Sequence, residues 1–191
     1  MNFTIGIGPN LGVTLSSDLS ANKHVSNICA TCFHWLRQLR RVLSSLDTES
    51  AATLVHAFVT SRVDYCNTLL ASISKSTTDR LQRVLNAAAS VVSKTRKFDH
   101  GLSQLLHDQL HWLNVPQRIY FKLCTTVYRC LQRKTPSYLV DLCKPLSDIA
   151  SRQHLRSANS HQLYVQRYRR TMFGRRTFEI RHCHHILLES D

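Results

Sequence analysis

The sequence predicts a mainly α-helical protein, an orthogonal bundle of five or six helices with a short N-terminal β-hairpin and a basic, weakly structured C-terminal tail. First, the 191 residues include only five Gly and four Pro, so helices meet few breaks. Second, apolar residues recur at helical spacing over most of the chain. Third, both ends depart from that spacing. We therefore divide the chain into residues 1–22, 23–147 and 148–191.

The N-terminal segment has the alternation of β-strands. Phe3, Ile5 and Ile7 alternate with small or polar residues, and Val13 and Leu15 repeat this period. The turn signal Gly8-Pro9-Asn10 lies between the two runs. Two short strands paired as a hairpin are therefore expected here.

Three helices are expected between Val25 and Lys97. The first extends from Val25 to Leu43, and the second is capped by Asp47 and continues to Leu70. The third begins at Ser76, with Asp79 completing a capping box, and ends among cations. Their expected buried faces are Val25, Ile28, Cys29, Cys32, Trp35, Leu36, Leu39, Val42 and Leu43; Leu54, Val55, Phe58, Val59, Val63, Cys66 and Leu70; and Leu81, Val84, Leu85, Ala88, Val91 and Val92.

Further helices are expected downstream. A short helix covers Leu102 to Trp112 and breaks near Asn114, because the residue before a proline avoids the α conformation. A longer helix from Pro116 to about Gln132 follows, with Pro116 in its first turn. Its inward residues are Ile119, Leu123, Val127 and Leu131. A last small helix is expected from Tyr138 to Cys143.

The charge balance points to a polyanionic partner. Lys and Arg number 25 against 12 Asp and Glu, a formal net charge of +13, which suits nucleic acid, although a basic surface can also be simply solvated. Residues 151–188 hold eight Arg and one acid. Aromatic residues among these arginines either stack on bases or pack back on the bundle, and the sequence leaves both interpretations open.

The seven cysteines are expected to be reduced and mostly buried, in an intracellular protein of the nucleus or cytoplasm. Cys29 and Cys32 form a Cys-x-x-Cys pair that could be half a zinc site or a redox pair, but a core role is favoured. The run from His182 to His185 is a further metal-binding alternative, against an incidental histidine-rich tail. We expect no metal site, no secretory signal and no membrane partner.

Catalytic motifs are absent from the sequence. It contains no Gly-rich phosphate loop, and its few acids are too scattered for a two-metal centre. Asp64 lies among core residues of the second helix, where a carboxylate needs a partner. We favour a structural role for Asp64 over that of a catalytic acid, and expect no catalytic residue.

Several ordered segments carry a resemblance to a known family. They include Leu11-Gly12-Val13, the run from His56 to Leu70, and Leu110-His111-Trp112-Leu113-Asn114-Val115-Pro116-Gln117-Arg118-Ile119. Together with Asp79–Ala89 and Phe173–Phe178, they resemble the C-terminal part of a reverse transcriptase of jockey-like non-LTR (LINE) retrotransposons. The resemblance implies that residues 1–22 are a remnant of the palm and primer grip. It further implies that residues 23–147 form the thumb and connection.

The departures from the family matter as much. Asn114 stands where the family usually has Pro, and the pattern stops after Phe178. The resemblance places the catalytic Asp-Asp box, the fingers and most of the palm upstream of Leu11. We therefore expect a truncated or frame-shifted copy with no cofactor of its own, the parent family being an Mg²⁺-dependent RNA-directed DNA polymerase.

Two functions remain open at this point. The first is an inactive polymerase fragment that binds RNA–DNA hybrid or RNA through nonspecific backbone contacts. The second is a non-enzymatic helical interaction or orphan domain without a nucleic-acid role. The resemblance suggests Gly12 for the primer-grip backbone. The candidate nucleic-acid contacts are Arg37, Arg40, Arg41, Arg80, Arg83, Lys94, Arg96, Lys97, Arg169, Arg170, Arg175 and Arg176.

Overall fold

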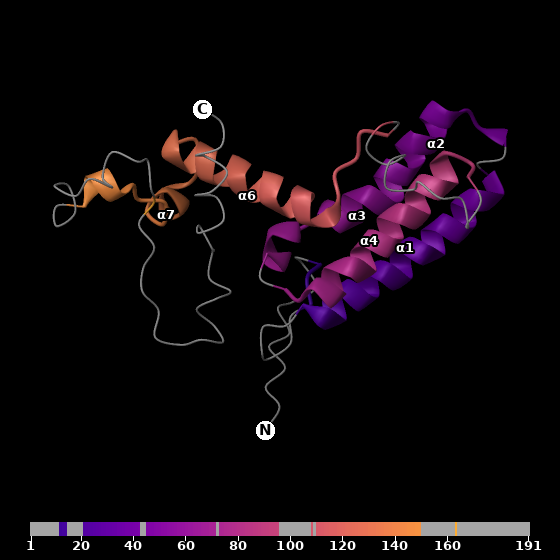
Figure 1. Cartoon of the computed structure of the whole chain (residues 1–191), viewed down its shortest axis with the longest axis horizontal. Helices are drawn as coiled ribbons and strands as arrows, with labels where there is room; N and C mark the ends of the chain where they lie inside the picture. Colours follow the sequence, from indigo (N-terminus) through magenta and orange to yellow (C-terminus); the bar gives the residue numbers. More distant parts are fainter. Residues whose placement is uncertain are drawn as a thin grey trace, which may run out of the picture. The chain divides into compact units, whose positions relative to one another are not determined.

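The computed structural model is mainly helical, as the sequence predicts (Figure 1). It describes residues 12–14, 21–42, 45–71, 73–95, 108, 110–149 and 163. The chain divides into two compact units, Met1–Ile119 and Tyr120–Asp191. The predicted N-terminal hairpin lies almost wholly outside the described residues, and Gly12–Thr14 have no regular secondary structure. The orthogonal arrangement of helices stays a prediction.

The first helix, α1, spans Asn22–Val42 and follows the predicted stripe closely. Its buried residues are His24, Val25, Cys29, Cys32, Leu36 and Leu39. Val42 was expected inside but is 54% exposed, because a terminal turn has neighbours on one side only. The helix thus buries one face along most of its length.

The second predicted helix is shorter and less regular than expected. Asp47 caps it as predicted, its carboxylate accepting a hydrogen bond from the Ser50 N–H at 3.0 Å. Helix α2 (Thr48–Val55) continues without interruption into the π-helix η3 (His56–Thr60) and α3 (Ser61–Asp64). Continuation to Leu70 was wrong, since the left-handed Cys66 (φ 52°) ends the helix before the 3₁₀ turn η4 (Asn67–Leu70).

The third helix, α4, spans Lys75–Val92. The predicted capping box was wrong, because the N-cap residue is Ser74, whose Oγ lies 3.0 Å from Oγ1 of Thr77, and Asp79 is exposed. Thr77 also donates to the Asn22 side chain at 2.9 Å. The first turns of α1 and α4 therefore lie together and the two helices run in the same direction, side by side in Figure 1.

The core of the first unit lies between these helices. Among the described elements, α1 and α4 form the most extensive contact. Leu81, Val84, Leu85 and Ala88 of α4 are fully buried, as are Val55, Val59 and Val63 of α2–α3. This burial of aliphatic side chains is the main source of stability for the unit.

The longest downstream helix, α6, spans Val115–Leu131 and begins where predicted. Asn114 precedes it, and its N–H donates to the side-chain oxygen of Gln117 at 2.9 Å, the reciprocal half of a capping box. Ile119, Leu123 and Val127 are buried as predicted, but Leu131 is 38% exposed at the frayed end. Of the helix expected at Leu102–Trp112, Asp108 is described and helical, whereas residues 110–112 are described and not helical.

The second unit continues with two short helical turns. These are α7 (Ser137–Val140) and the 3₁₀ turn η5 (Leu146–Asp148). The helix expected at Tyr138–Cys143 is therefore shorter than predicted and starts one residue earlier. Pro145 forms an isolated antiparallel bridge with Leu163. The rest of the basic tail lies outside the described residues.

Candidate nucleic-acid interface

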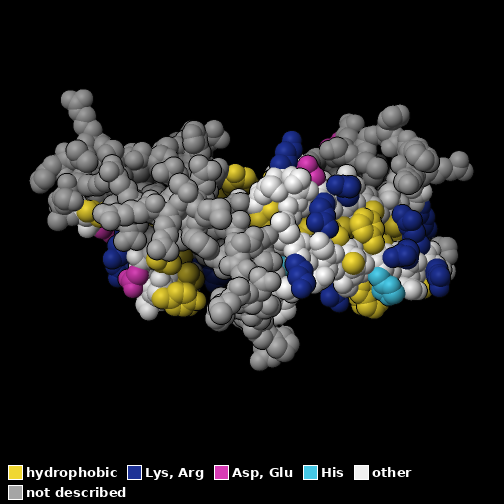
Figure 2. Space-filling model, turned by 90° about the horizontal axis from the view of Figure 1, so that it is seen from below, with side chains coloured by type: hydrophobic (Ala, Val, Ile, Leu, Met, Phe, Trp, Pro, Cys, Tyr) yellow, Lys and Arg dark blue, Asp and Glu magenta, His cyan; other side chains and the backbone are white. Residues whose placement is uncertain are grey.

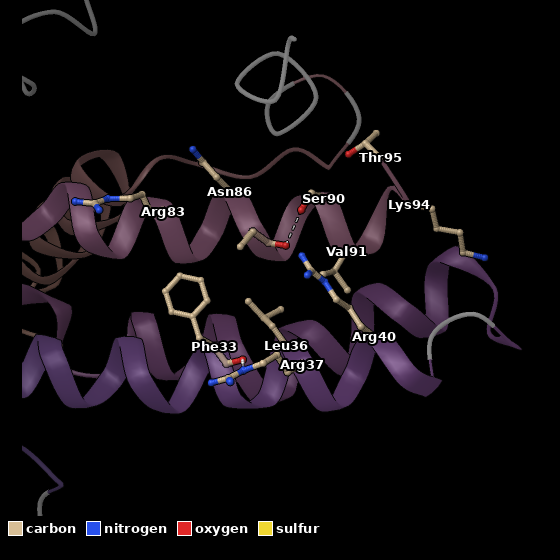
Figure 3. Close-up of a pocket in the computed structure, with 11 residues that line it drawn as sticks. Phe33, Leu36, Arg37, Arg40, Arg83, Asn86, Ser90, Val91, Lys94 and Thr95 are labelled. Atoms are coloured by element: carbon tan, nitrogen blue, oxygen red, sulfur yellow. Dashed lines mark hydrogen bonds between the residues drawn. The ribbon is translucent and has the colours of Figure 1, made fainter. Parts of the chain in front are cut away.

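A groove between α1 and α4 brings several of the predicted contact residues together. Its volume is about 960 Å³, and α1 and α4 form its two walls (Figure 3). The residues that line it are Phe33, Leu36, Arg37, Arg40, Arg83, Asn86, Ala87, Ser90, Val91, Lys94 and Thr95. Its floor is apolar and its rims are cationic.

Among the described residues that line this groove, four are cations and none is an acid. Arg37 and Arg40 come from α1, whereas Arg83 lies on α4 and Lys94 follows its end. Arg40 and Arg83 are exposed, and neither pairs with a carboxylate of the described residues. Figure 2 shows dark blue side chains around apolar patches on this part of the surface. A hollow lined by one sign of charge concentrates its field and attracts anions.

The other two groove cations have backbone partners. The Nε of Arg37 donates to the Phe33 carbonyl one turn earlier at 3.3 Å. Lys94 has a left-handed backbone (φ 55°), and its Nζ donates to the Leu46 carbonyl at 3.3 Å. Each partner is a neutral carbonyl and not a carboxylate.

Two further candidates lie elsewhere on these helices. Arg80 is half-buried and donates to the Ser26 hydroxyl at 2.9 Å, so it ties α4 to α1. Arg41 is exposed but does not line the groove. The remaining predicted cations, Arg96, Lys97, Arg169, Arg170, Arg175 and Arg176, lie outside the described residues.

Gly12 lies at a second, smaller hollow of about 490 Å³, together with His24, Arg62 and Tyr65. Its backbone is left-handed (φ +62°), a conformation that favours glycine, and an added Cβ would lie 3.7 Å from the Tyr65 ring. His24 is buried, accepts a hydrogen bond from the Thr14 N–H at 3.5 Å, and has its pKa lowered by burial. The conformation thus accounts for glycine at position 12.

Asp64 has the partner that a structural role requires. Its carboxylate pairs with Nη1 of Arg118 at 2.7 Å, and the two side chains are 30% and 13% exposed. The same guanidinium donates from Nε to the Leu113 carbonyl at 2.8 Å and lies 5.9 Å from the centre of the Trp112 ring. These contacts join the two segments that carry the strongest family resemblance, and we name them the Asp64–Arg118 junction.

A side-chain amide network lies at the start of α6. Gln82 on α4 accepts from the Val115 N–H at 2.9 Å and donates to the side-chain oxygens of Asn86 and Asn114 at 2.9 and 3.2 Å. Asn114 therefore supplies an acceptor that proline could not. The departure from the family at this position has a defined structural role.

The paired cysteines of α1 belong to the core. Cys29 is 8% exposed and Cys32 is fully buried, with its Sγ 3.8 Å from the Val59 carbonyl. Burial raises the pKa of both thiols, that of Cys32 to about 11, so both stay protonated at neutral pH. No group of three or more potential metal ligands occurs within the described part of the chain, and the 182–185 run lies outside it.

Sequence reasoning missed Phe33, which is 39% exposed within the groove. Phe33, Arg37 and Arg40 are spaced i, i+4, i+7, the signature of one helix face. That spacing was available from the sequence. Phe33 was not selected because it lies outside the apolar stripe from which the helix was predicted.

Comparisons with known proteins identify no relative. No family model, no curated protein and no solved structure matches the chain. Among the described helices, none is both long enough and apolar enough to cross a membrane.

Proposed function

We propose that the chain is a C-terminal fragment of a retrotransposon RNA-directed DNA polymerase that binds nucleic-acid backbones through the α1–α4 groove. It has no catalytic activity, since the sequence lacks a cluster of carboxylates for Mg²⁺. It acts inside the cell, in the nucleus or the cytoplasm. Residues 1–22 are the remnant of the palm and primer grip, and the helices correspond to the thumb and connection of the parent enzyme.

The observation that carries this proposal is the set of four cations, with no acid, among the described residues that line the groove. Arginine and lysine contacts to phosphates give affinity without reading sequence. The helical segments that resemble a polymerase thumb are the same ones that form the groove. The groove cations and the resemblance thus support the same surface.

Binding of a labelled RNA–DNA hybrid, measured by fluorescence anisotropy across a salt series, tests the proposal. The double variant Arg40→Gln/Arg83→Gln removes one exposed cation from each wall. We expect its affinity to fall about tenfold at low salt and its dependence on salt to weaken, because fewer counterions are released.

The matched control is Lys23→Gln/Lys75→Gln, which removes the same charge from exposed positions of the same two helices. Its affinity should change less than threefold. Equal losses of hybrid affinity in both variants would show that the groove cations act only through general charge attraction. Absence of binding by the wild-type protein even at low salt would refute the proposal.

One observation favours the alternative of a helical interaction domain. Phe121, Tyr138 and Leu142 of the second unit are 67%, 65% and 56% exposed. Exposed apolar side chains of this size are typical of protein-binding surfaces. If the chain binds neither hybrid nor RNA, this alternative becomes the better account.

A further inference from the structure

Phe33 places an aromatic ring among the cations of the groove. Its side chain is 39% exposed although it belongs to a helix with a well-formed buried face. Figure 3 shows the ring in the opening between α1 and α4, with Arg83 across from it and Arg37 near its base. An exposed ring beside arginines is the combination on which bases of single-stranded nucleic acid stack.

The pairing state of a nucleic acid limits what can reach the ring. In a duplex the bases are stacked on one another between the two backbones, so a duplex offers phosphates to the cations but no free base face to Phe33. An unpaired base of a single strand can lie on an aromatic side chain. A duplex would therefore touch only the rims, whereas a single strand can reach the ring.

The cations extend along the groove rather than gathering at one point. Arg83 lies nine residues before Val92, the last residue of α4, which corresponds to roughly 14 Å along the helix axis, and Lys94 follows two residues beyond that end. Arg37 and Arg40 follow the opposite wall. This length allows the groove to hold several consecutive phosphates of one strand.

Polar atoms inside the groove are mostly engaged with the protein itself. The Ser90 hydroxyl donates to the Ala87 carbonyl at 2.9 Å, and the Asn86 side-chain oxygen accepts from Gln82 at 2.9 Å. Few groups remain for reading base edges. Recognition through stacking and charge is expected to tolerate any sequence.

We propose that the groove is a single-strand site, in which one base stacks on Phe33 while Arg37, Arg40, Arg83 and Lys94 hold the neighbouring phosphates. This inference rests on the proposed nucleic-acid function and adds its substrate class. It also assigns Phe33 a specific role that the charge of the groove does not require.

The test compares labelled oligo-dT and oligo-U of about 12 nucleotides with an RNA–DNA hybrid of equal length. We expect Phe33→Leu to weaken single-strand binding about tenfold and hybrid binding less than twofold, because a leucine cannot stack. Phe33→Trp should retain or raise the single-strand affinity. With four cations engaged, the slope of log affinity against log salt should be about −3 for a single strand.

The matched control is Phe121→Leu, an aromatic that is more exposed than Phe33 and lies outside the groove. It should leave both affinities unchanged, and circular dichroism of each variant confirms that the fold is retained. Unchanged single-strand binding in Phe33→Leu, with a loss in Arg40→Gln/Arg83→Gln, would overturn the stacking site and leave the proposed function standing. Absence of binding to every probe would instead refute the proposed function itself.

Discussion

The α1–α4 groove and the Asp64–Arg118 junction both depend on arginine, but they use it in opposite ways. At the junction, Arg118 is 13% exposed and its guanidinium meets a carboxylate at 2.7 Å and a carbonyl at 2.8 Å. In the groove, Arg40 and Arg83 are exposed and meet no carboxylate of the described residues. One region holds its charge pair inside the fold, and the other presents charge to the solvent.

From this difference we expect the junction arginine to contribute to folding stability and the groove arginines to contribute to the proposed binding. A paired and largely buried arginine fixes how elements pack, and its loss removes the nearest countercharge of the partner carboxylate. Neighbouring exposed arginines repel one another and add little to folding, and their presence on facing walls is consistent with the proposed anionic ligand. The two segments joined at the Asp64–Arg118 junction, which carry the resemblance to the retrotransposon family, therefore contribute mainly to packing.

The largest effect is expected from Arg118→Ala at the junction. Removal of the guanidinium leaves a partly buried Asp64 carboxylate and should lower the free energy of unfolding by about 2 kcal/mol, below the loss for a fully buried pair because water still reaches Asp64. Urea denaturation followed by circular dichroism measures this. Hybrid affinity of the folded variant should stay unchanged.

A second substitution, Asp64→Asn added to Arg118→Ala, provides the control for this prediction. It removes the carboxylate charge that has lost its Arg118 partner and should restore part of the lost stability. If Arg118→Ala instead left stability intact and weakened hybrid binding, the contrast between junction and groove would be wrong.

A smaller effect is expected at Lys94, which combines a groove cation with a left-handed backbone (φ 55°). Lys94→Gly relieves this conformation at the end of α4 and should raise the free energy of unfolding by about 0.5–1 kcal/mol. The hydrogen bond lost to Leu46 is exposed and offsets little of the gain. Thermal unfolding measures the stability, and anisotropy measures the accompanying loss of hybrid affinity.

Lys94→Asn is the informative companion to this variant, because asparagine also tolerates the left-handed region and equally removes the charge. A similar loss of affinity in both variants would assign the binding effect to the ammonium group. Destabilisation by Lys94→Gly would show that the lysine side chain contributes more to folding than its backbone costs.

The smallest effect concerns pH. Burial lowers the pKa of His24 below its ordinary value of 6.5, so the folded protein binds this proton less readily than the unfolded chain. The contribution of neutral His24 is fully present above about pH 6.5 and is lost as the pH falls below that value. Denaturant midpoints at about pH 7.5 and 5.5 should therefore differ more for the wild type than for His24→Gln.

His34→Gln serves as the control, because His34 is exposed on the same helix. It should leave the pH dependence as in the wild type. If His24→Gln retained the full acid sensitivity, another group would be responsible. Measurements that compare groove and junction are best made above pH 7, where this contribution is constant.

Periodicity was sufficient to predict α1, α4 and α6 because each buries one continuous apolar face. Periodicity did not predict helix ends that are set by a local backbone conformation. Leu69 and Leu70 continue an apolar pattern, yet Tyr65 is extended and Cys66 left-handed, so the helix ends at Asp64. Similarly, Ser74 rather than Ser76 caps α4, a choice between two serines that spacing alone does not resolve.

The sequence was sufficient to select individual cations of the groove but not to predict how they are arranged in space. A net charge of +13 and runs of arginine identified Arg37, Arg40 and Arg83. The sequence did not reveal that α1 and α4 run side by side in the same direction, which is what places these cations on facing walls. Nor did it distinguish Arg80, which binds Ser26, from Arg83 one turn later.

The π-helix η3 has a consequence for the helix that contains it. Ala51, Val55, Val59 and Val63 are all buried and lie exactly four positions apart. In a regular α-helix each step of four residues overshoots a full turn by roughly 40°, so such a series would wind gradually away from its partner. The wider turn at His56–Thr60 absorbs the excess. A strict four-residue repeat can thereby stay on the buried side of the helix over about three turns.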